Sequence, residues 1–296
     1  MFRLKRFGRT GSLMMNRQKS FESHRPTLYL VPTPIGNRQE MTERALKILE
    51  SVDCIAAEDT RNTRTLLQMY GIHTPLISHH EHNQAQSIQQ ITDRLAQGQS
   101  LAVVSDAGYP LISDPGQNLV RRILEQGYPV VSVSGANAAL NALVASGLDC
   151  HHYVFYGFLD HKSSHRKKEL ERLATIPFTM IFYEAPHRIE ATLKDILEVL
   201  GDRNMCLARE LTKVHEEYLR GTVSEILEVA ASCKGEMVIV IEGAVKKEDP
   251  DMDQLAQKVL KYAETMRLKD AAAQVSKEYN VSKNQLYQMA LQQKDN

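Results

Sequence analysis

The sequence predicts an α/β protein of about two compact domains, and three observations carry that prediction. The chain has 296 residues, and a domain takes roughly 100 to 200 residues. From residue 28 onward, short apolar runs of strand length alternate with amphipathic stretches of helix length. The apolar runs are continuous instead of alternating with polar residues, which is typical of parallel strands buried on both faces.

Strands and helices follow one another through the first half of the chain, and a turn rich in Gly or Pro follows three of the strands. Loops that leave the carboxyl ends of parallel strands are where open α/β sheets bind ligands. The three turns are PTPIGN at 32–37, DAGYPLISDPG at 106–116 and SGANA at 134–138. We expect strands at 28–31, 54–58, 101–106 and 129–133, and helices at 42–52, 87–98 and 117–128.

The pattern changes near residue 150, where a second unit begins. Its strands contain bulky or alternating residues, which favours a mixed sheet. Helical patterns follow a charged linker to the end of the chain, and the turn at Asn280 predicts a small appendage similar to a helix-turn-helix. We expect a disordered basic leader at 1–26, an α/β domain at 27–149, a second α/β domain at 150–245, and the linker with its helical appendage at 246–296.

The composition excludes several classes of protein. Lys plus Arg and Asp plus Glu both number 36, so the net charge gives no sign of a nucleic-acid partner. The four scattered cysteines form no CxxC pair, which argues against a zinc site or disulfide framework and favours a reducing, cytoplasmic setting. No stretch approaches the roughly 18 apolar residues of a membrane span, so we expect a soluble protein. The basic N-terminal segment favours a disordered leader or a start at Met14 or Met15, with an organellar transit peptide as the alternative.

The strongest cue for a ligand site is the loop that follows the predicted strand at 101–106. This strand brings Asp106 to its carboxyl end, and Gly108, Pro110 and further conformationally restricted residues follow. A rigid wall of small residues suits a flat, polar small molecule that backbone groups hold by hydrogen bonds, although turn chemistry without a ligand is the alternative. The chain contains neither GxGxxG nor GxxxxGK followed by Ser or Thr, which argues against dinucleotide and P-loop sites.

A second polar cluster follows the predicted strand at 54–58, where Glu58 and Asp59 precede Arg61 and Arg64. The two arginines are neighbours on the surface if a helix begins there, and Asp59 is then suited to cap that helix. The cluster has two interpretations. It serves only as a cap with ion pairs, or it forms a catalytic floor in which arginines hold phosphates and a carboxylate orients a hydroxyl.

Histidines gather in the segment ISHHEHNQ at 77–84, which contains His79, His80 and His82. A first-row metal needs further ligands, and none follows at helical spacing. We therefore favour a polar loop, either facing a substrate or solvated, over a metal site.

The predicted second domain supplies further charged residues. YEAPHR at 183–188 places Glu184 and Arg188 at another strand end. The segment 162–172 is basic and includes Arg166 and Lys167. These residues form either an ordinary solvated face or a phosphate-binding rim.

Five motifs in this order give the chain a family resemblance. They are LYLVPTPIGN, AEDTRNTR, SDAGYPLISDPG, FYEAPHR and ARELTKVHEEYLRGT, and the resemblance covers about residues 27–243, with a similar helical appendage behind it. The chain resembles the methyltransferases of small-subunit ribosomal RNA within the tetrapyrrole-methylase-like superfamily. This resemblance implies a class III fold, in which two α/β domains hold the methyl donor S-adenosylmethionine in the cleft between them, in a homodimer. It also implies 2′-O-methylation of a decoding-centre cytidine in 16S RNA, on the assembled small ribosomal subunit and without a metal.

The resemblance also assigns roles to residues of this chain. Because a ribose hydroxyl is a poor nucleophile, the protein must orient it and receive its proton, and the candidates are Glu58, Asp59 and Glu184. Arginines are expected to hold the RNA phosphates, namely Arg61, Arg64 and Arg188, with Arg166 and Lys167 in the basic rim. The implied donor contacts are Pro34, Gly36, Asp106, Ala107, Gly108, Leu111, Ile112, Ser113, Asp114, Ser134, Gly135, Ala138, Ala185, Pro186 and Met237.

Two positions depart from the family pattern. Tyr109 replaces the usual threonine of the AGTP turn, and Ser134 replaces a proline because SGANA stands where PGPSA or PGACA is more usual. Ser134 lacks the fixed φ of proline, so we expect a more mobile loop before the ligand binds. The following Gly135 remains, and we therefore expect weakened donor binding at most.

Three other functions stay open. The same fold supports C-methyltransferases of tetrapyrrole precursors, against which the paired arginines and the basic second domain count. The chain also fits a non-catalytic ribosome assembly factor, which detectable donor turnover would exclude. A metal hydrolase built on the histidine segment has the least support.

Overall fold

A computed structural model describes residues 17–21, 25–80, 84–113, 117–244, 251–279 and 281–294 of the chain. The chain divides into two compact units, one that ends at Gly243 and one that begins at Ala244. Most of the predicted basic leader, including Met14 and Met15, lies outside the described residues.

The first sheet of unit 1 is fully parallel, as the continuous apolar runs predicted. Its strands have the order β3-β2-β4-β1-β5. Their bounds are β1 Leu28–Leu30, β2 Cys54–Ala57, β3 Leu76–Ser78, β4 Leu101–Val104 and β5 Val130–Ser132. The helices between them are the 3-10 helix η1 Arg38–Glu40 and the α-helices α1 Glu43–Ser51, α2 Thr60–Met69, α3 Gln84–Ala96 and α4 Gln117–Glu125.

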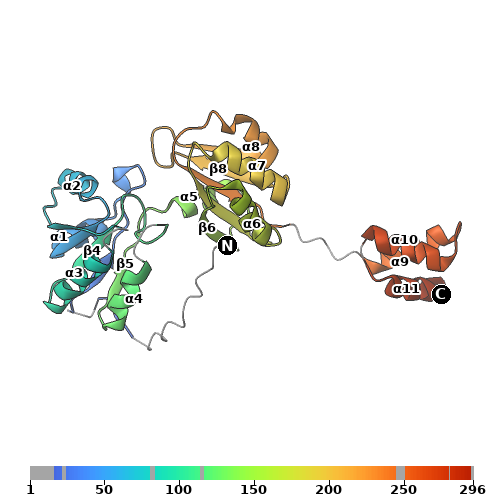
Figure 1. Ribbon diagram of the computed structural model, residues 1–296, viewed down its shortest axis with the longest axis horizontal. Helices are drawn as coiled ribbons and strands as arrows, with labels where there is room; N and C mark the ends of the chain where they lie inside the picture. Colours follow the sequence, from blue (N-terminus) through green and yellow to red (C-terminus); the bar gives the residue numbers. More distant parts are fainter. Residues whose placement is uncertain are drawn as a thin grey trace. The chain divides into compact units, whose positions relative to one another are not determined.

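Helices cover both faces of this sheet (Figure 1), and β4 shows why the sequence requires it. Ala102 and Val104 of β4 pack with residues of α1 and α2, whereas Leu101 and Val103 pack with residues of α3 and α4. All four β4 residues are buried, so a polar residue on either face would lose its water without gaining a partner. We call residues 25–137 the first lobe.

The second sheet is mixed, which also agrees with the prediction. Its order is β6-β7-β10-β8-β9, and only β6 and β7 run parallel. The strands are β6 Tyr153–Phe158, β7 Thr179–Glu184, β8 Asn204–Arg209, β9 Glu217–Thr222 and β10 Met237–Ile241. The helices are α5 Ala138–Ser146, α6 Ser163–Leu173, α7 Ile189–Leu200 and α8 Val223–Ala230.

Helix α5 belongs by its packing to the second sheet, although it precedes the boundary that the sequence predicted at 149/150. Ala142 and Leu143 of α5 pack against Ile181 and Val240 on one sheet face. Helices α6, α7 and α8 supply the large apolar cluster on the other face. We call residues 138–243 the second lobe.

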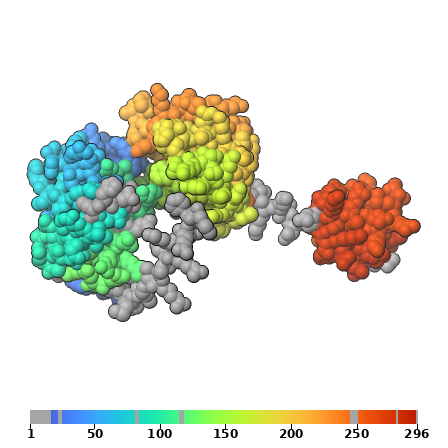
Figure 2. Space-filling model, in the orientation of Figure 1, coloured from blue at the N-terminus to red at the C-terminus, as the bar shows by residue number. Residues whose placement is uncertain are grey.

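Unit 2 consists of three helices, α9 Met252–Ala263, α10 Leu268–Tyr279 and α11 Lys283–Lys294. Their shared core includes Val259, Val275 and Leu286, and Figure 2 shows them in red as a compact body. The predicted helical appendage is thus confirmed, while Asn280 itself lies outside the described residues. Within the described part of the chain, every helix is too short or too polar to cross a membrane.

Candidate functional site

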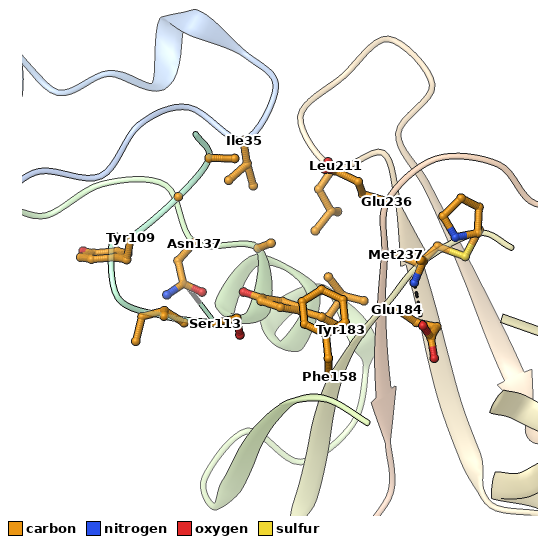
Figure 3. A pocket seen from close by; sticks show the side chains of 17 residues that line it. Ile35, Tyr109, Ser113, Asn137, Phe158, Tyr183, Glu184, Leu211, Glu236 and Met237 are labelled. Carbon is orange, nitrogen blue, oxygen red and sulfur yellow. Dashed lines mark hydrogen bonds between the residues drawn. The ribbon is translucent and has the colours of Figure 1, made fainter. Parts of the chain in front are cut away.

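A cavity of about 370 Å³ opens where loops of the first lobe meet the second lobe. Figure 3 shows Ile35, Tyr109 and Asn137 on one side and Leu211 and Met237 on the other. On the first-lobe side, the walls come from the loops that leave the carboxyl ends of β1, β4 and β5. Open α/β sheets bind ligands at such loops, so the cavity lies where the turn pattern predicted a site.

The structure brings together eight of the residues assigned to donor contacts, and all of them line the cavity: Ala107, Gly108, Ile112, Ser113, Ala138, Ala185, Pro186 and Met237. Six others do not line it: Pro34, Gly36, Asp106, Leu111, Ser134 and Gly135. Asp114 lies outside the described residues. Sequence reasoning missed Ile35, Asn137, Phe158, Leu211, Glu236 and Val238 as lining residues.

A strained backbone shapes the first-lobe wall of the cavity. Leu111 and Ser113 have φ values of 74° and 64°. Residues other than glycine rarely adopt this left-handed backbone conformation. Gly108 has φ 73°, and its backbone exchanges two hydrogen bonds of 3.0 Å with Thr33. These bonds fix the loop after β4 against the loop after β1. Strain held in this way is typical of ligand-binding loops.

Tyr109 ties the loops after β4 and β5 together. The backbone N–H of Gly135 donates a hydrogen bond of 3.1 Å to the Tyr109 hydroxyl. A Cβ atom on Gly135 would lie 2.8 Å from the Pro32 side chain, so the loop also needs glycine at this place. The two departures from the family pattern thus lie in loops that contact each other, because the Tyr109 hydroxyl holds the residue that follows Ser134.

Tyr109→Phe removes this one hydrogen bond and leaves the ring in place. We expect the dissociation constant for S-adenosylmethionine to rise about three- to tenfold, because a hydrogen bond contributes about 0.5–1.5 kcal/mol. Isothermal titration measures it. Tyr128→Phe, elsewhere in the first lobe, is the matched control. Equal affinities for the two variants would show that the bond does not support donor binding.

Glu184, which lines the cavity, forms an ion pair with Arg188 in the second lobe. Glu184 is 3% exposed, and its carboxylate accepts hydrogen bonds from the Ala185 N–H at 2.8 Å and from the Thr192 hydroxyl. The Ala185 bond is dashed in Figure 3. Arg188 lies 3.2 Å from Glu184 and donates to the Leu159 carbonyl at 2.8 Å. The geometry therefore gives Glu184 the task of holding the wall at Ala185, and it engages Arg188 internally instead of presenting it to RNA.

Asp59 caps α2, as one of the two sequence interpretations predicted. Its carboxylate accepts from the Arg61 N–H at 2.8 Å and forms an ion pair of 2.9 Å with the Arg61 guanidinium. These interactions lower the pKa of Asp59 to about 2. A carboxylate with so low a pKa is a weak proton acceptor. Glu58, directly before it, has no side-chain partner among the described residues.

The end of β2 lies beside the end of β4, because these strands are neighbours in the sheet. Asn62 of α2 donates a hydrogen bond of 3.1 Å to the carboxylate of Asp106, the second residue after the end of β4. Arg61 and Arg64 are both exposed on α2. Two exposed cations therefore flank a carboxylate cluster at the carboxyl edge of the first sheet.

The prediction that Arg166 binds RNA is contradicted by its burial. Arg166 is 3% exposed, and its guanidinium lies 2.7 Å from the Asp195 carboxylate. It also donates to the carbonyl of Asp160 at 3.2 Å. The neighbouring Lys167 is partly exposed and pairs with Glu198 at 2.6 Å. Arg166 thus serves the interior of the second lobe.

The histidine segment packs partly inside the first lobe. His79 is buried, its Nδ1 lies 2.7 Å from the Ser87 hydroxyl, and burial lowers its pKa. His82 lies outside the described residues. Among the residues that the structure describes, no group of three or more His, Cys, Asp or Glu side chains is arranged to hold a metal ion.

Comparison with protein families and solved structures agrees with this geometry. The family model "Tetrapyrrole (Corrin/Porphyrin) Methylases" matches residues 27–227, and "RsmI C-terminal HTH domain" matches residues 248–294. Cobalt precorrin-4 methyltransferase has a TM-score of 0.57 at 16% identity, over 73% of this chain and 94% of that one. Diphthine synthase has a TM-score of 0.59 at 11% identity, over 73% and 90%. These two structures show the shared fold.

Curated relatives share much more sequence with the chain. "Ribosomal RNA small subunit methyltransferase I" of Bacillus subtilis (strain 168) is 49% identical over 245 residues, which is 81% of this chain and 84% of the relative. The protein of the same name from Escherichia coli O157:H7 is 45% identical over 285 residues, which is 94% and 99%. With a family model over most of its length and relatives this similar, the chain belongs to the ribosomal RNA small subunit methyltransferase I family, on the tetrapyrrole methylase fold.

Proposed function

We propose that this protein methylates the ribose 2′-oxygen of a cytidine in the decoding centre of 16S ribosomal RNA, on the assembled small subunit. The observation that carries the proposal is a donor-sized cavity whose wall residue Ala107 directly follows Asp106, the residue that Asn62 of the arginine-bearing helix α2 contacts. The relatives of the chain are named for small-subunit ribosomal RNA. We place the reaction in the cytoplasm, which suits the four free cysteines Cys54, Cys150, Cys206 and Cys233.

S-adenosylmethionine is the methyl donor of this family, and the residues of the cavity fit it. The volume of about 370 Å³ lies within the usual range for a small-molecule site. Ala107, Gly108, Ala138 and Ala185 give the cavity small walls that a flat purine ring can approach closely. Tyr183 and Phe158 supply aromatic surface, while the Glu236 carboxylate and the Asn137 amide supply polar contacts. The bound donor supplies a methyl group on a positively charged sulfur, which is already activated for transfer.

The protein's own residues then have two tasks, to orient the ribose hydroxyl and to receive its proton. Of the three candidate carboxylates, Glu184 is engaged by Ala185 and Thr192, and Asp59 by Arg61. Glu58 is the one without a partner among the described residues. We therefore propose that the Glu58 carboxylate accepts the proton of the ribose hydroxyl. Arg61 and Arg64 on α2 hold the RNA phosphates beside it.

We further propose that two copies of the chain associate, as the family resemblance implied. Val144 on α5 is 73% exposed, and Tyr153 on β6 is 44% exposed. Strand β6 lies at an edge of its sheet, where unpaired backbone and bulky apolar side chains are suited to another protein surface.

Val144→Asp is expected to weaken self-association at least about tenfold, because it places a charge in the contact. Sedimentation equilibrium measures the dissociation constant. Val229→Asp, at a half-exposed valine on α8, is the control. A wild-type protein that sediments as a single copy at micromolar concentration would contradict the dimer.

The function is tested by incubating the purified protein with labelled S-adenosylmethionine and small subunits from cells that lack the modification. The labelled nucleotide is then mapped, and the methyl group is assigned to ribose or base. We expect one ribose-methylated cytidine in the decoding centre. Donor binding without transfer would instead direct the search to another acceptor, with a tetrapyrrole precursor first, and absence of any turnover would favour an assembly factor.

A further inference from the structure

A rigid loop of the second lobe stands at the rim of the donor cavity. This tip loop, residues 210–216, contains Glu210 and Thr212 with φ values of 50° and 67°. The Thr212 N–H donates to the Glu216 carboxylate at 2.6 Å, and the Lys213 N–H donates to the Glu210 carbonyl at 3.0 Å. Two left-handed residues and these internal bonds hold the loop in one shape.

Both lobes anchor the tip loop beside the cavity. Leu211 and Glu236 line the cavity, and the Lys213 ammonium lies 3.0 Å from the Glu236 carboxylate. From the first lobe, the Asn37 N–H donates to the Thr212 hydroxyl at 2.9 Å. A Cβ atom on Gly36 would lie 2.5 Å from the Lys213 side chain, which shows how closely the two loops approach. The loop is therefore part of the cavity's rim.

At the end of this loop the chain presents an apolar side chain to solvent. Val214 is 97% exposed, the highest value for a large apolar side chain in the described part of the molecule. Single exposed apolar residues are ordinary on protein surfaces. Val214 differs because its loop is held rigidly and stands on the wall of the cavity.

Polar groups suited to a nucleic-acid backbone lie beside the tip. A shallow cavity of about 250 Å³ is lined by Arg209, His215 and Lys234 among others. Arg209 is engaged, because its guanidinium forms an ion pair with Glu217. The side chains of His215 and Lys234 are exposed and have no partner among the described residues.

We propose that Val214 inserts into the base stack of the RNA next to the target nucleotide, while His215 and Lys234 contact its backbone. This inference rests on the proposed function. A ribose within a folded RNA must leave its stack to reach a methyl group held in a cavity, and proteins that open base stacks insert apolar side chains between the bases. A rigid tip at the rim of the donor cavity has the position, shape and chemistry for that task.

Val214→Ser tests the proposal, with Val214→Leu as the conservative variant and Val229→Ser as the matched control. The substrates are S-adenosylmethionine and small subunits that lack the modification. We expect Val214→Ser to lower kcat/KM for the subunit about tenfold, since it removes an apolar contact with the bases. Donor affinity should stay at the wild-type value in all three variants. Val214→Leu and Val229→Ser should keep subunit activity within about twofold, because one keeps the apolar tip and the other lies elsewhere.

Equal kcat/KM for Val214→Ser and Val229→Ser would overturn the proposal, and so would failure of Val214→Leu to retain activity. A lower sedimentation coefficient for Val214→Ser than for the wild type would overturn it too, by assigning Val214 to a contact between copies. If the wild type itself transfers no methyl to subunits, the proposed function fails first. If the wild type is active and Val214→Ser is equally active, the insertion of Val214 is rejected while the proposed function stands.

Discussion

Replacing Glu58 with glutamine is expected to lower the single-turnover rate of methyl transfer to small subunits by about 10²–10⁴-fold, the usual contribution of a positioned general base. Glu58 directly follows β2 at the carboxyl edge of the first sheet, next to the end of β4. Its carboxylate has no partner among the described residues, so it is available to accept the proton of the ribose hydroxyl. Glutamine keeps the size of the side chain and removes its basicity. Rapid-quench measurement with saturating subunits isolates the transfer step.

Two neighbouring carboxylates make this prediction selective. Asp59→Asn is expected to reduce the rate by about tenfold at most, because the pKa of about 2 already makes Asp59 a poor base. Its main effect should be a less stable α2, since the asparagine keeps the cap but loses the ion pair with Arg61. Glu50→Gln, at an exposed position of α1, controls for charge and should match the wild type. A greater loss for Asp59→Asn than for Glu58→Gln would reverse the assignment.

Periodicity predicted four of the five strands of the first lobe, and a comparison of β4 with β3 shows why the fifth strand, β3, was missed. LAVV is apolar at every position because both faces of β4 are covered, so the strand is visible in any short window of sequence. Strand β3 has three residues, LIS, at the edge of the sheet, and all three are only partly buried. An edge strand so short leaves too few apolar positions to define a period.

The position of α5 could not be predicted because its sequence does not select one face. AALNALVAS is small and apolar around most of the helix, so it fits against either sheet. The structure packs it on the second sheet, where Ala142 and Leu143 face the strands and Val144 faces outward. The sequence of α5 alone does not determine which sheet it packs against, because this depends on how both lobes pack around it.

The candidate site was predicted best where backbone geometry restricts the residue type. Gly108 and the turn around it are visible because few residues adopt a φ of 73°. The second-lobe walls were harder, since Leu211 and Val238 have the composition of ordinary core residues. Asn137 lies one position before Ala138, which the motifs did indicate, so adjacency was the available signal.

Charged side chains were the least predictable, because the sequence does not show whether a charge is solvated or paired. Arg166 and Lys168 both belong to the basic segment of α6. Arg166 faces inward onto Asp195, whereas Lys168 is exposed. The partner of Arg166 lies 29 positions further along the chain, on α7. The basic run therefore contains a buried, paired residue, Arg166, and an exposed one, Lys168. Substitution of each residue in turn can distinguish their roles.

Arg166→Ala is expected to lower the free energy of unfolding by about 3 kcal/mol, because it removes the nearer of the two cations beside the buried Asp195 carboxylate and leaves only the Lys167 ammonium, at 3.7 Å. Urea denaturation measures this loss. Arg166→Met combined with Asp195→Leu should recover most of the stability, since an apolar pair of similar volume replaces a buried ion pair at little cost. Lys168→Ala, on the exposed side of the same helix, should leave stability unchanged. If Arg166→Ala kept wild-type stability and raised KM for the small subunit, Arg166 would contact RNA after all. If Arg166→Ala is destabilised with an unchanged KM, and the double substitution restores stability, the role of Arg166 is to stabilise the core of the second lobe.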